Sequence, residues 1–288
     1  MTIKIITDSC CDLPPELAAE LGLEVLPLLV INEEIEYRDQ LDITPKGVYD
    51  GMREGKIYKT AQLPPHVFEE SFERIAREGK SAIYLGFSSE LSATFQSARM
   101  AKNSVLEKYP ELDIELIDTR AASGGFGMIV YETVKKANEG ASMEEVLKTA
   151  NFYIENIDHI FTVDDIEYLY RGGRVSKTSA VLGGMLNIKP VLEVKEGKLG
   201  PVDKVRGRQK ALRRILELME ERSVDKDLSN RKVFIYHGDD PEAAERIREM
   251  IAEKFGVNDF YISLIGAVIG AHTGPGTISV FYSKRNPV

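Results

Sequence analysis

The stretch IKIITDSCCDLPPELAAEL, residues 3–21, decides the fold class. It opens with an isoleucine-rich run at residues 3–6, which predicts a strand, and this run stops at the polar residues 7–9. Pro14 and Pro15 follow. A proline suits the first turn of a helix because the N–H that it lacks would have no partner there. A strand, a polar turn and a helix in this order are typical of a mainly parallel α/β sheet.

The same alternation continues through the first half of the chain, and the second half differs in pattern. The elements expected next are an extended run at Glu24–Ile31, a helix that includes Phe68, Phe72, Ile75 and Ala76, a strand at Ala82–Leu85, and a helix that begins at Ser92 with Phe95 and Met100 towards the core. In the second half, the runs Ile188–Val194 and Val202–Val205 predict a hairpin across Glu196-Gly197-Lys198. A length of 288 residues favours two domains. We place their boundary near residues 155–165, which gives domains at residues 1–160 and 161–288.

Composition excludes several classes of protein. The 288 residues are 43% hydrophobic and carry a formal net charge of −9, which opposes nucleic acid and the anionic face of a membrane. No run of about 18 apolar residues predicts a membrane span. The first residues have neither a basic leader nor a cleavage site, so a cytoplasmic location is expected.

The two cysteines, Cys10 and Cys11, are adjacent. Neighbouring side chains of an extended chain point to opposite faces, so a disulfide between them would be strained. The sequence around them lacks a second cysteine pair or a nearby histidine that would complete a metal site. Reduced, packed thiols are expected, and no metal.

Four polar segments lie where a strand is expected to end, which is the usual place for a ligand on an open α/β sheet. They are Thr7-Asp8-Ser9, Lys59–Pro65, Phe87–Phe95 and Gly266–Gly276. Each also has a plain structural interpretation. Asp8 fits a turn or a helix cap, Ser92 fits an N-cap, and a lone histidine such as His272 is commonly structural. The alternative is that hydroxyls at a helix start and an imidazole in a glycine-rich turn receive an anion.

Signatures of catalysis are missing from the sequence. It has no G-x-S-x-G elbow, no H-E-x-x-H motif, no Walker loop and no G-x-G-x-x-G after the first strand. Neutral donors and one histidine suit the binding of a small anionic head group better than they suit a reaction.

Seven motifs in order resemble those of the DegV family and cover almost the whole chain. They are Asp8-Ser9, Lys59-Thr60-Ala61-Gln62, Ser88-Ser89-Glu90-Leu91-Ser92-Ala93-Thr94, Ile117-Asp118-Thr119, Arg171-Gly172-Gly173-Arg174-Val175-Ser176, Ile188-Lys189-Pro190 and His272-Thr273-Gly274-Pro275-Gly276. The resemblance implies an α/β fold of two domains, the first a mainly parallel three-layer sandwich and the second a mixed sheet with helices. It also implies a long-chain fatty acid as ligand, no other cofactor, no catalytic residue, and a fatty acid kinase as the partner that phosphorylates the bound carboxylate.

The resemblance also assigns the head-group contacts, with two departures from the family pattern. The usual Thr-Ser-Gln-Pro reads Thr60-Ala61-Gln62-Leu63, and the usual Leu-Ser-Gly-Thr has Ala93 in place of glycine. Ala61 lacks a hydroxyl that could touch the ligand. Only Thr60, Ser92 and His272 are therefore expected to bind the carboxylate.

The two ends of such a ligand would contribute to binding in different ways. Burial gains about 0.8 kcal/mol per CH₂, so a tail of about 14 methylenes would gain roughly 11 kcal/mol before the costs of association. A buried carboxylate without partners costs several kcal/mol. The tail would supply affinity and the polar residues orientation.

A local excess of positive charge lies between residues 171 and 210. Its cations are Arg171, Arg174, Lys177, Lys189, Lys195, Lys198, Lys204, Arg206, Arg208 and Lys210, opposed by Glu193, Glu196 and Asp203. This is either a solvated surface or a docking face for the kinase or for a phosphate, with Arg171, Arg174, Arg206 and Arg208 as contacts.

Two other functions remain open. Ser92 and His272 could be the nucleophile and base of a lipid hydrolase. The fold kinship between the DegV family and the substrate-binding part of dihydroxyacetone kinases offers a small ketone as ligand, which requires a small polar pocket.

Overall fold

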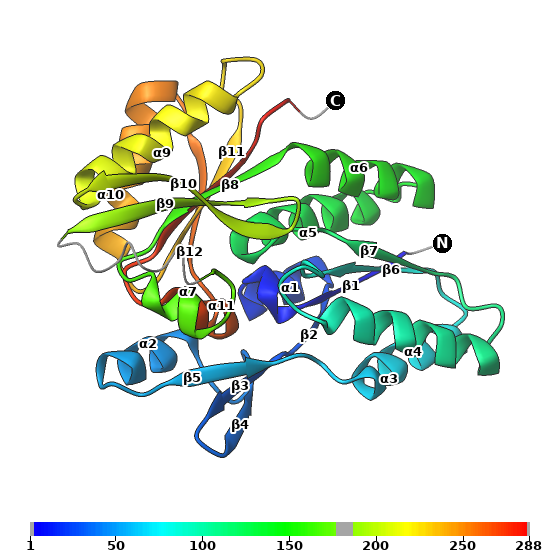
Figure 1. The fold of residues 1–288 in the computed structure, drawn as a ribbon. Coiled ribbons are helices and arrows are strands. Elements are labelled where there is room, and N and C mark those ends of the chain that lie inside the picture. Colours follow the sequence, from blue (N-terminus) through cyan, green and yellow to red (C-terminus); the bar gives the residue numbers. More distant parts are fainter. Residues whose placement is uncertain (1–2, 177–186, 287–288) are drawn as a thin grey trace.

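The computed structural model describes residues 3–176 and 187–286, which form two large β-sheets and one small sheet with helices packed around them (Figure 1). No helix of these residues is both long enough and apolar enough to cross a membrane.

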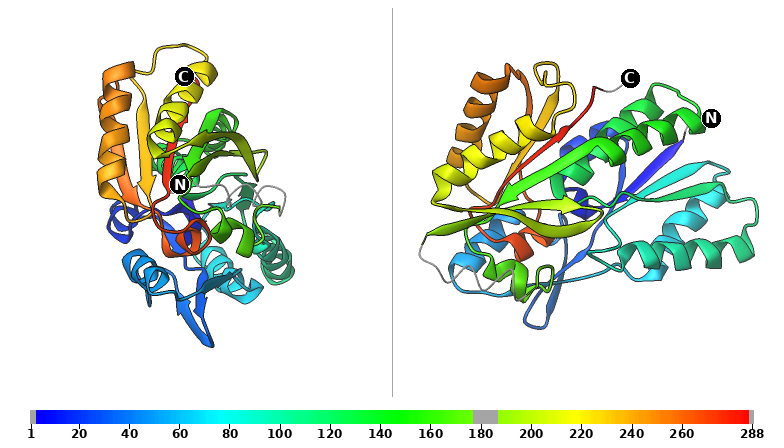
Figure 2. Two further views of the ribbon diagram at one scale, coloured as in Figure 1. Left: turned by 60° about the vertical axis from the view of Figure 1, so that its left-hand side comes forward. Right: turned by 45° about the horizontal axis from the view of Figure 1, so that its top comes forward.

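The first large sheet is parallel, as predicted from the opening stretch. Its strands in order are β2 (Glu24–Leu26), β1 (Lys4–Asp8), β6 (Ala82–Gly86) and β7 (Ile114–Asp118). The helices packed around it are α1 (Pro15–Leu21), α3 (Pro65–Arg77), α4 (Thr94–Lys108), α5 (Ser123–Asn138) and α6 (Met143–Asn156). Helices α3 and α4 pack together on one face and α5 and α6 on the other, which gives the expected three layers (Figures 1 and 2).

The second large sheet is mixed, also as predicted. Its strands in order are β10 (Lys198–Arg206), β9 (Ile188–Lys195), β8 (Ile157–Thr162), β13 (Ile278–Ser283), β11 (Lys232–His237) and β12 (Asp259–Leu264). Helices α9 (Arg208–Arg222) and α10 (Pro241–Phe255) cover its outer face (Figure 2). Strands β9 and β10 form the predicted hairpin across residues 196 and 197.

The small sheet was not foreseen, and it corrects one expectation. It contains β4 (Ile35–Arg38), β3 (Leu29–Asn32) and β5 (Tyr58–Ala61), with α2 (Pro45–Arg53) beside it. The single run expected at Glu24–Ile31 is wrong, because β2 and β3 belong to different sheets. Pro27 lies between them and cannot donate to a ladder, and the next amide, that of Leu28, donates to Ser9 Oγ at 3.1 Å.

Helix α5 lies between the two large sheets and is buried along most of its length. Three glycines permit the close approach. A Cβ on Gly124 would lie 2.5 Å from Tyr236, one on Gly125 would lie 2.2 Å from His159, and one on Gly127 would lie 2.5 Å from the carbonyl oxygen of Cys11. One apolar cluster therefore joins residues of both sheets, and the domain limits stay predictions.

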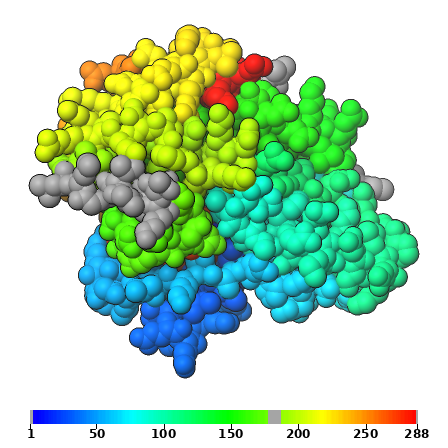
Figure 3. Space-filling view, viewed as in Figure 1, coloured from blue at the N-terminus to red at the C-terminus, as the bar shows by residue number. Residues whose placement is uncertain are grey.

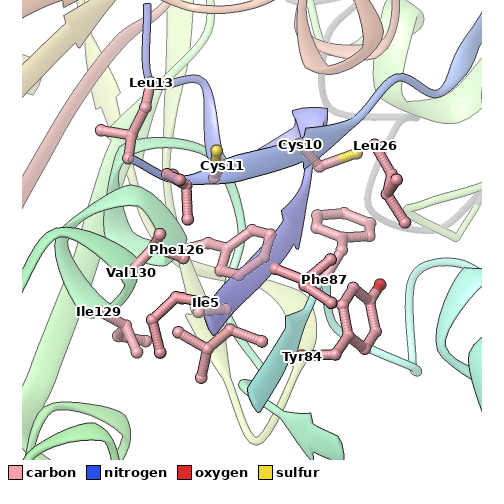
Figure 4. Packing of buried hydrophobic residues seen from close by; sticks show 14 of the residues in the cluster. Ile5, Cys10, Cys11, Leu13, Leu26, Tyr84, Phe87, Phe126, Ile129 and Val130 are labelled. Carbon is pink, nitrogen blue, oxygen red and sulfur yellow. The ribbon is translucent and has the colours of Figure 1, made fainter. Parts of the chain in front are cut away.

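The turn after β1 confirms the structural interpretation of Asp8. Its carboxylate accepts from the amide of Cys10 at 3.2 Å and caps the 3-10 helix η1 (Ser9–Cys11). Cys10 and Cys11 are fully buried free thiols, as expected. Figure 4 shows their sulfur atoms apart from each other, with Phe87 and Phe126 in the cluster nearby.

Helix α4 differs from expectation at its start and on one face. It begins at Thr94, two residues after Ser92. Phe95 is half-buried and stacks on Tyr84 with ring centroids 6.2 Å apart, but Met100 is 54% exposed, so its predicted place in the core is wrong. Met100 lies five residues, about 500°, beyond Phe95, which places the two side chains about 140° apart around the helix.

Candidate functional site

A cavity lies where the small sheet, the mixed sheet and the loops after β1 and β6 meet. About 770 Å³ of its space is free of atoms, its opening to solvent included. Its lining is mostly apolar. The apolar residues are Cys10, Leu28, Ala61, Phe87, Leu91, Ala122, Phe161, Leu169, Val194, Leu199, Ile265, Val268, Ile269 and Phe281, and the polar ones are Thr60, Gln62, Ser92, Ser123, Arg174, His272, Thr273 and Ser279.

Thr60 and His272 form a close polar contact in the cavity wall. Thr60 lies in β5, and its Oγ1 is 2.7 Å from Nε2 of His272. His272 lies in the short helix α11 (Ala267–Thr273), so the glycine-rich turn expected around it is wrong for this residue. Burial, and then the charge of Arg174, lower the pKa of His272 to about 4. The imidazole is neutral at pH 7 and can donate one hydrogen bond and accept another.

Ser92 lines the same cavity from the loop before α4. Its Oγ is 2.9 Å from Oγ1 of Thr94 and accepts from the Thr94 amide at 3.2 Å. The other two serines of this segment are engaged elsewhere, because Ser88 donates to the carbonyl oxygen of Gly197 and Ser89 donates to Asp118. The three predicted head-group residues therefore meet at one cavity.

Arg174 also lines this cavity, although the sequence placed it with the docking residues. Its Nε donates to the carbonyl oxygen of Leu91 at 3.3 Å, and its guanidinium donates to the carbonyl oxygen of Gly172. Within the described residues no carboxylate lies in ion-pair range of it. Burial lowers the pKa of this guanidinium. Its adjacent motif residues gave no sign that it would turn inward.

The other three predicted docking arginines differ among themselves. Arg208 is engaged internally, since it pairs with Asp164 at 2.8 Å and Asp240 at 2.6 Å. Arg171 lies in the last turn of α7 (Glu167–Arg171), over the ring of Tyr168 at 4.9 Å. Arg206 is exposed and has no ion pair within the described part of the chain. Lys177, another member of the positive segment, lies outside the described residues.

The β9–β10 hairpin forms one wall of the cavity. Val194 and Leu199 are cross-strand partners and both line it. At the hairpin tip, Ser88 Oγ donates to the carbonyl oxygen of Gly197 at 2.8 Å, and Lys198 lies 3.3 Å from Glu90. Figure 3 shows the yellow-green surface of the hairpin meeting the cyan surface of the first half of the chain.

An unpredicted cluster of buried carboxyl groups lies close to Cys10. Burial raises the pKa of Asp8 and Asp39 to about 6 and that of Asp12 well above its usual range. Ser123 Oγ donates to Asp12 at 2.6 Å. Within the described ranges no group of His, Cys, Asp or Glu side chains is arranged to hold a metal ion.

Comparison with known proteins places the chain in a family. The model of the family described as "Uncharacterised protein, DegV family" matches residues 2–285. The chain belongs to the DegV family. A DegV domain-containing protein of Clostridium perfringens is 41% identical over 281 residues, with 96% of each chain covered.

Solved structures of DegV proteins have the same fold. A DegV family protein from Thermus thermophilus, described as fatty acid binding, is 33% identical, has a TM-score of 0.85 and covers 98% of this chain and 99% of its own. A stearic acid-binding protein from Eubacterium ventriosum is 26% identical, has a TM-score of 0.89 and covers 98% of each chain.

Proposed function

We propose that this DegV protein binds a long-chain fatty acid in the cavity, with the carboxylate at Thr60, Ser92 and His272. The observation that carries the proposal is that these three side chains, from separate elements, line one largely apolar cavity. The fatty acids of the T. thermophilus and E. ventriosum relatives support the ligand class.

Arg174 supplies the charge for this head group. It is a half-buried cation without a carboxylate partner among the described residues. A bound carboxylate would form that pair and would accept hydrogen bonds from the neutral donors beside it. The bound carboxylate would then offset the free-energy cost of burying the Arg174 charge, which is the cost that lowers the pKa of Arg174.

The same cavity disfavours the two other functions. The lipid hydrolase requires His272 to take a proton from Ser92, but Nε2 of His272 is 2.7 Å from Thr60 Oγ1, and Ser92 Oγ contacts Thr94. A small ketone requires a small polar pocket, whereas most of this lining is apolar. The protein therefore acts as a carrier that does not turn its ligand over.

The carrier delivers its fatty acid to a partner fatty acid kinase, which phosphorylates the carboxylate. Arg171 and Arg206 are exposed and would steer an acidic partner, although Arg171 Nε also lies 3.8 Å from Glu167. Arg208 does not contact the partner directly, because its guanidinium is already paired with Asp164 and Asp240, and it supports the docking surface only through these ion pairs.

Mass spectrometry of ligand extracted from the denatured, purified protein tests the ligand class. A long-chain fatty acid is expected, with no hydrolysis of lipid esters by the same preparation. Ser92→Leu should fill the head-group end and abolish the bound lipid. Ser89→Leu, at an exposed neighbouring serine, is the matched control and should keep it. Full lipid content in Ser92→Leu would contradict the assignment.

A further inference from the structure

Two adjacent glycines after α7 are glycine for different reasons. Gly173 has φ of 72°, a left-handed conformation that favours glycine, and a Cβ there would meet nothing within 4 Å. Gly172 has φ of −71° and ψ of −11°, which other residues adopt readily. The backbone therefore gives no reason for glycine at position 172.

The imidazole of His272 occupies the space where a side chain at position 172 would lie. A Cβ on Gly172 would be 2.1 Å from Nδ1 of His272, 3.0 Å from Cε1 and 3.2 Å from Cγ. Packed heavy atoms lie about 3.5 to 4.0 Å apart. Even a methyl group at position 172 must displace either the ring or the end of α7.

Helix α11 cannot move away from this contact. Gly270 precedes His272 by two residues and points about 200° around the helix from it. There the buried hydroxyl of Tyr49 fills the space, since a Cβ on Gly270 would lie 2.6 Å from it. Tyr49 also donates to the carbonyl oxygen of Ile265 at 3.2 Å. The atoms that a Cβ on Gly172 would meet all belong to the end of the His272 side chain, so turning this ring relieves the clash with less disturbance than moving the backbone at the end of α7.

Turning the ring moves Nε2 away from Thr60. We infer that Gly172 is a positioning residue for His272, because its missing side chain lets the imidazole lie against the end of α7 and reach Thr60 Oγ1 at 2.7 Å. The inference rests on the proposed function, in which Thr60 and His272 receive the carboxylate. The same turn carries Arg174, whose guanidinium donates to the carbonyl oxygen of Gly172. One short segment therefore positions both the imidazole of His272 and the guanidinium of Arg174.

A double-mutant cycle tests this inference, with stearate as the probe. Gly172→Ala should weaken stearate binding at least tenfold in the parent protein and less than twofold in a His272→Ala background, because the ring that it displaces is gone. Gly200→Ala is the matched control, since a Cβ there meets nothing within 4 Å and its φ is not positive. Parent-like binding by Gly172→Ala, or an equal loss in both backgrounds, overturns the inference.

Two further readouts separate this role from plain destabilisation. Histidine ring NMR, assigned with His272→Ala, should show shifted ring resonances and a changed pKa of His272 in Gly172→Ala, because the turned ring has different surroundings; an unchanged titration overturns the inference. If Gly172→Ala does not fold, Gly172→Ala with His272→Ala should fold, and its failure counts against the inference. If His272→Ala alone binds stearate as the parent does, the proposed head-group site fails, and the NMR titration still decides the role of Gly172.

Discussion

Thr60 Oγ1 and His272 Nε2 lie 2.7 Å apart although 212 residues separate them in the sequence. Their contact ties β5 of the small sheet to α11, which follows the last parallel strand of the mixed sheet. The proposed head-group end of the cavity therefore depends on both halves of the chain. Each residue can be tested separately because the fold does not rest on this contact alone.

Thr60→Val removes the hydroxyl and keeps the shape. A buried polar group that loses its partner costs about 1 to 3 kcal/mol, so fatty acid binding should weaken roughly tenfold to a hundredfold. Calorimetric titration with stearate measures this change. Thr149→Val in α6, whose hydroxyl bonds to the Glu145 carbonyl oxygen on the surface, should bind as the parent does. Equal affinity in the two variants would contradict the role of Thr60.

Asp39→Asn tests the raised pKa of Asp39 in the buried carboxyl cluster, through the pH dependence of stability. The folded-state pKa of Asp39, about 6, lies above the ordinary 3.8, so the folded protein holds this proton more tightly than the unfolded chain. Stability from this group is fully present below pH 3.8 and is lost as pH rises through 6. The difference in the free energy of unfolding between Asp39→Asn and the parent should therefore change by about 2 to 3 kcal/mol in favour of the variant as pH rises from 4 to 7.

Chemical denaturation at several pH values measures that difference. Asp42→Asn is the control of opposite sign, because a hydrogen bond from Arg38 lowers the pKa of exposed Asp42 to about 2. Stability from Asp42 is present above pH 3.8 and is lost as pH falls through about 2, so Asp42→Asn should lower stability at neutral pH and match the parent only below about pH 2. A flat difference between Asp39→Asn and the parent from pH 4 to pH 7 would show that Asp39 has an ordinary pKa.

The sequence predicted some of these features and missed others for physical reasons. Local patterns predicted the hairpin, the cap at Asp8 and the strand–helix alternation that is typical of a parallel sheet, since each of these depends on residues near one another in the chain. The inward turn of Arg174 and the space that Gly172 leaves for His272 depend on packing between distant elements. No local pattern distinguishes Gly172 from Gly173, although only Gly173 needs glycine for its backbone.

Substitutions of Arg206 and Arg208 distinguish a role in docking the kinase from a role in stabilising the fold. Arg206→Glu should slow association with the kinase, make its rate less sensitive to salt and leave lipid content unchanged, because steering charges act through solvent over about 8 to 10 Å. Arg208→Glu should instead destabilise the fold by about 2 kcal/mol or more, because it sets a third acid between Asp164 and Asp240. Stopped-flow association and thermal unfolding measure the two effects. Normal association by Arg206→Glu would mean that this surface is only solvated.

Ser88→Ala tests how the β9–β10 hairpin closes the cavity. The Ser88 hydroxyl is fully buried and donates to the carbonyl oxygen of Gly197 at 2.8 Å, and the hairpin partners Val194 and Leu199 line the cavity. Removing the donor leaves a buried carbonyl oxygen unpaired, which costs about 1 to 3 kcal/mol and acts at the hairpin tip.

Bound fatty acid should therefore leave Ser88→Ala faster than the parent, by roughly tenfold if the lost contact is made in the closed state only. Affinity should fall less than the release rate rises, because an open hairpin also speeds entry. Displacement of a fluorescent fatty acid followed by stopped flow measures both rates. Ser89→Ala, which loses only the hydrogen bond from exposed Ser89 to Asp118, should release its ligand at the parental rate. If the two serine variants release ligand equally fast, the hairpin tip does not control access, and the fatty acid leaves by another wall of the cavity.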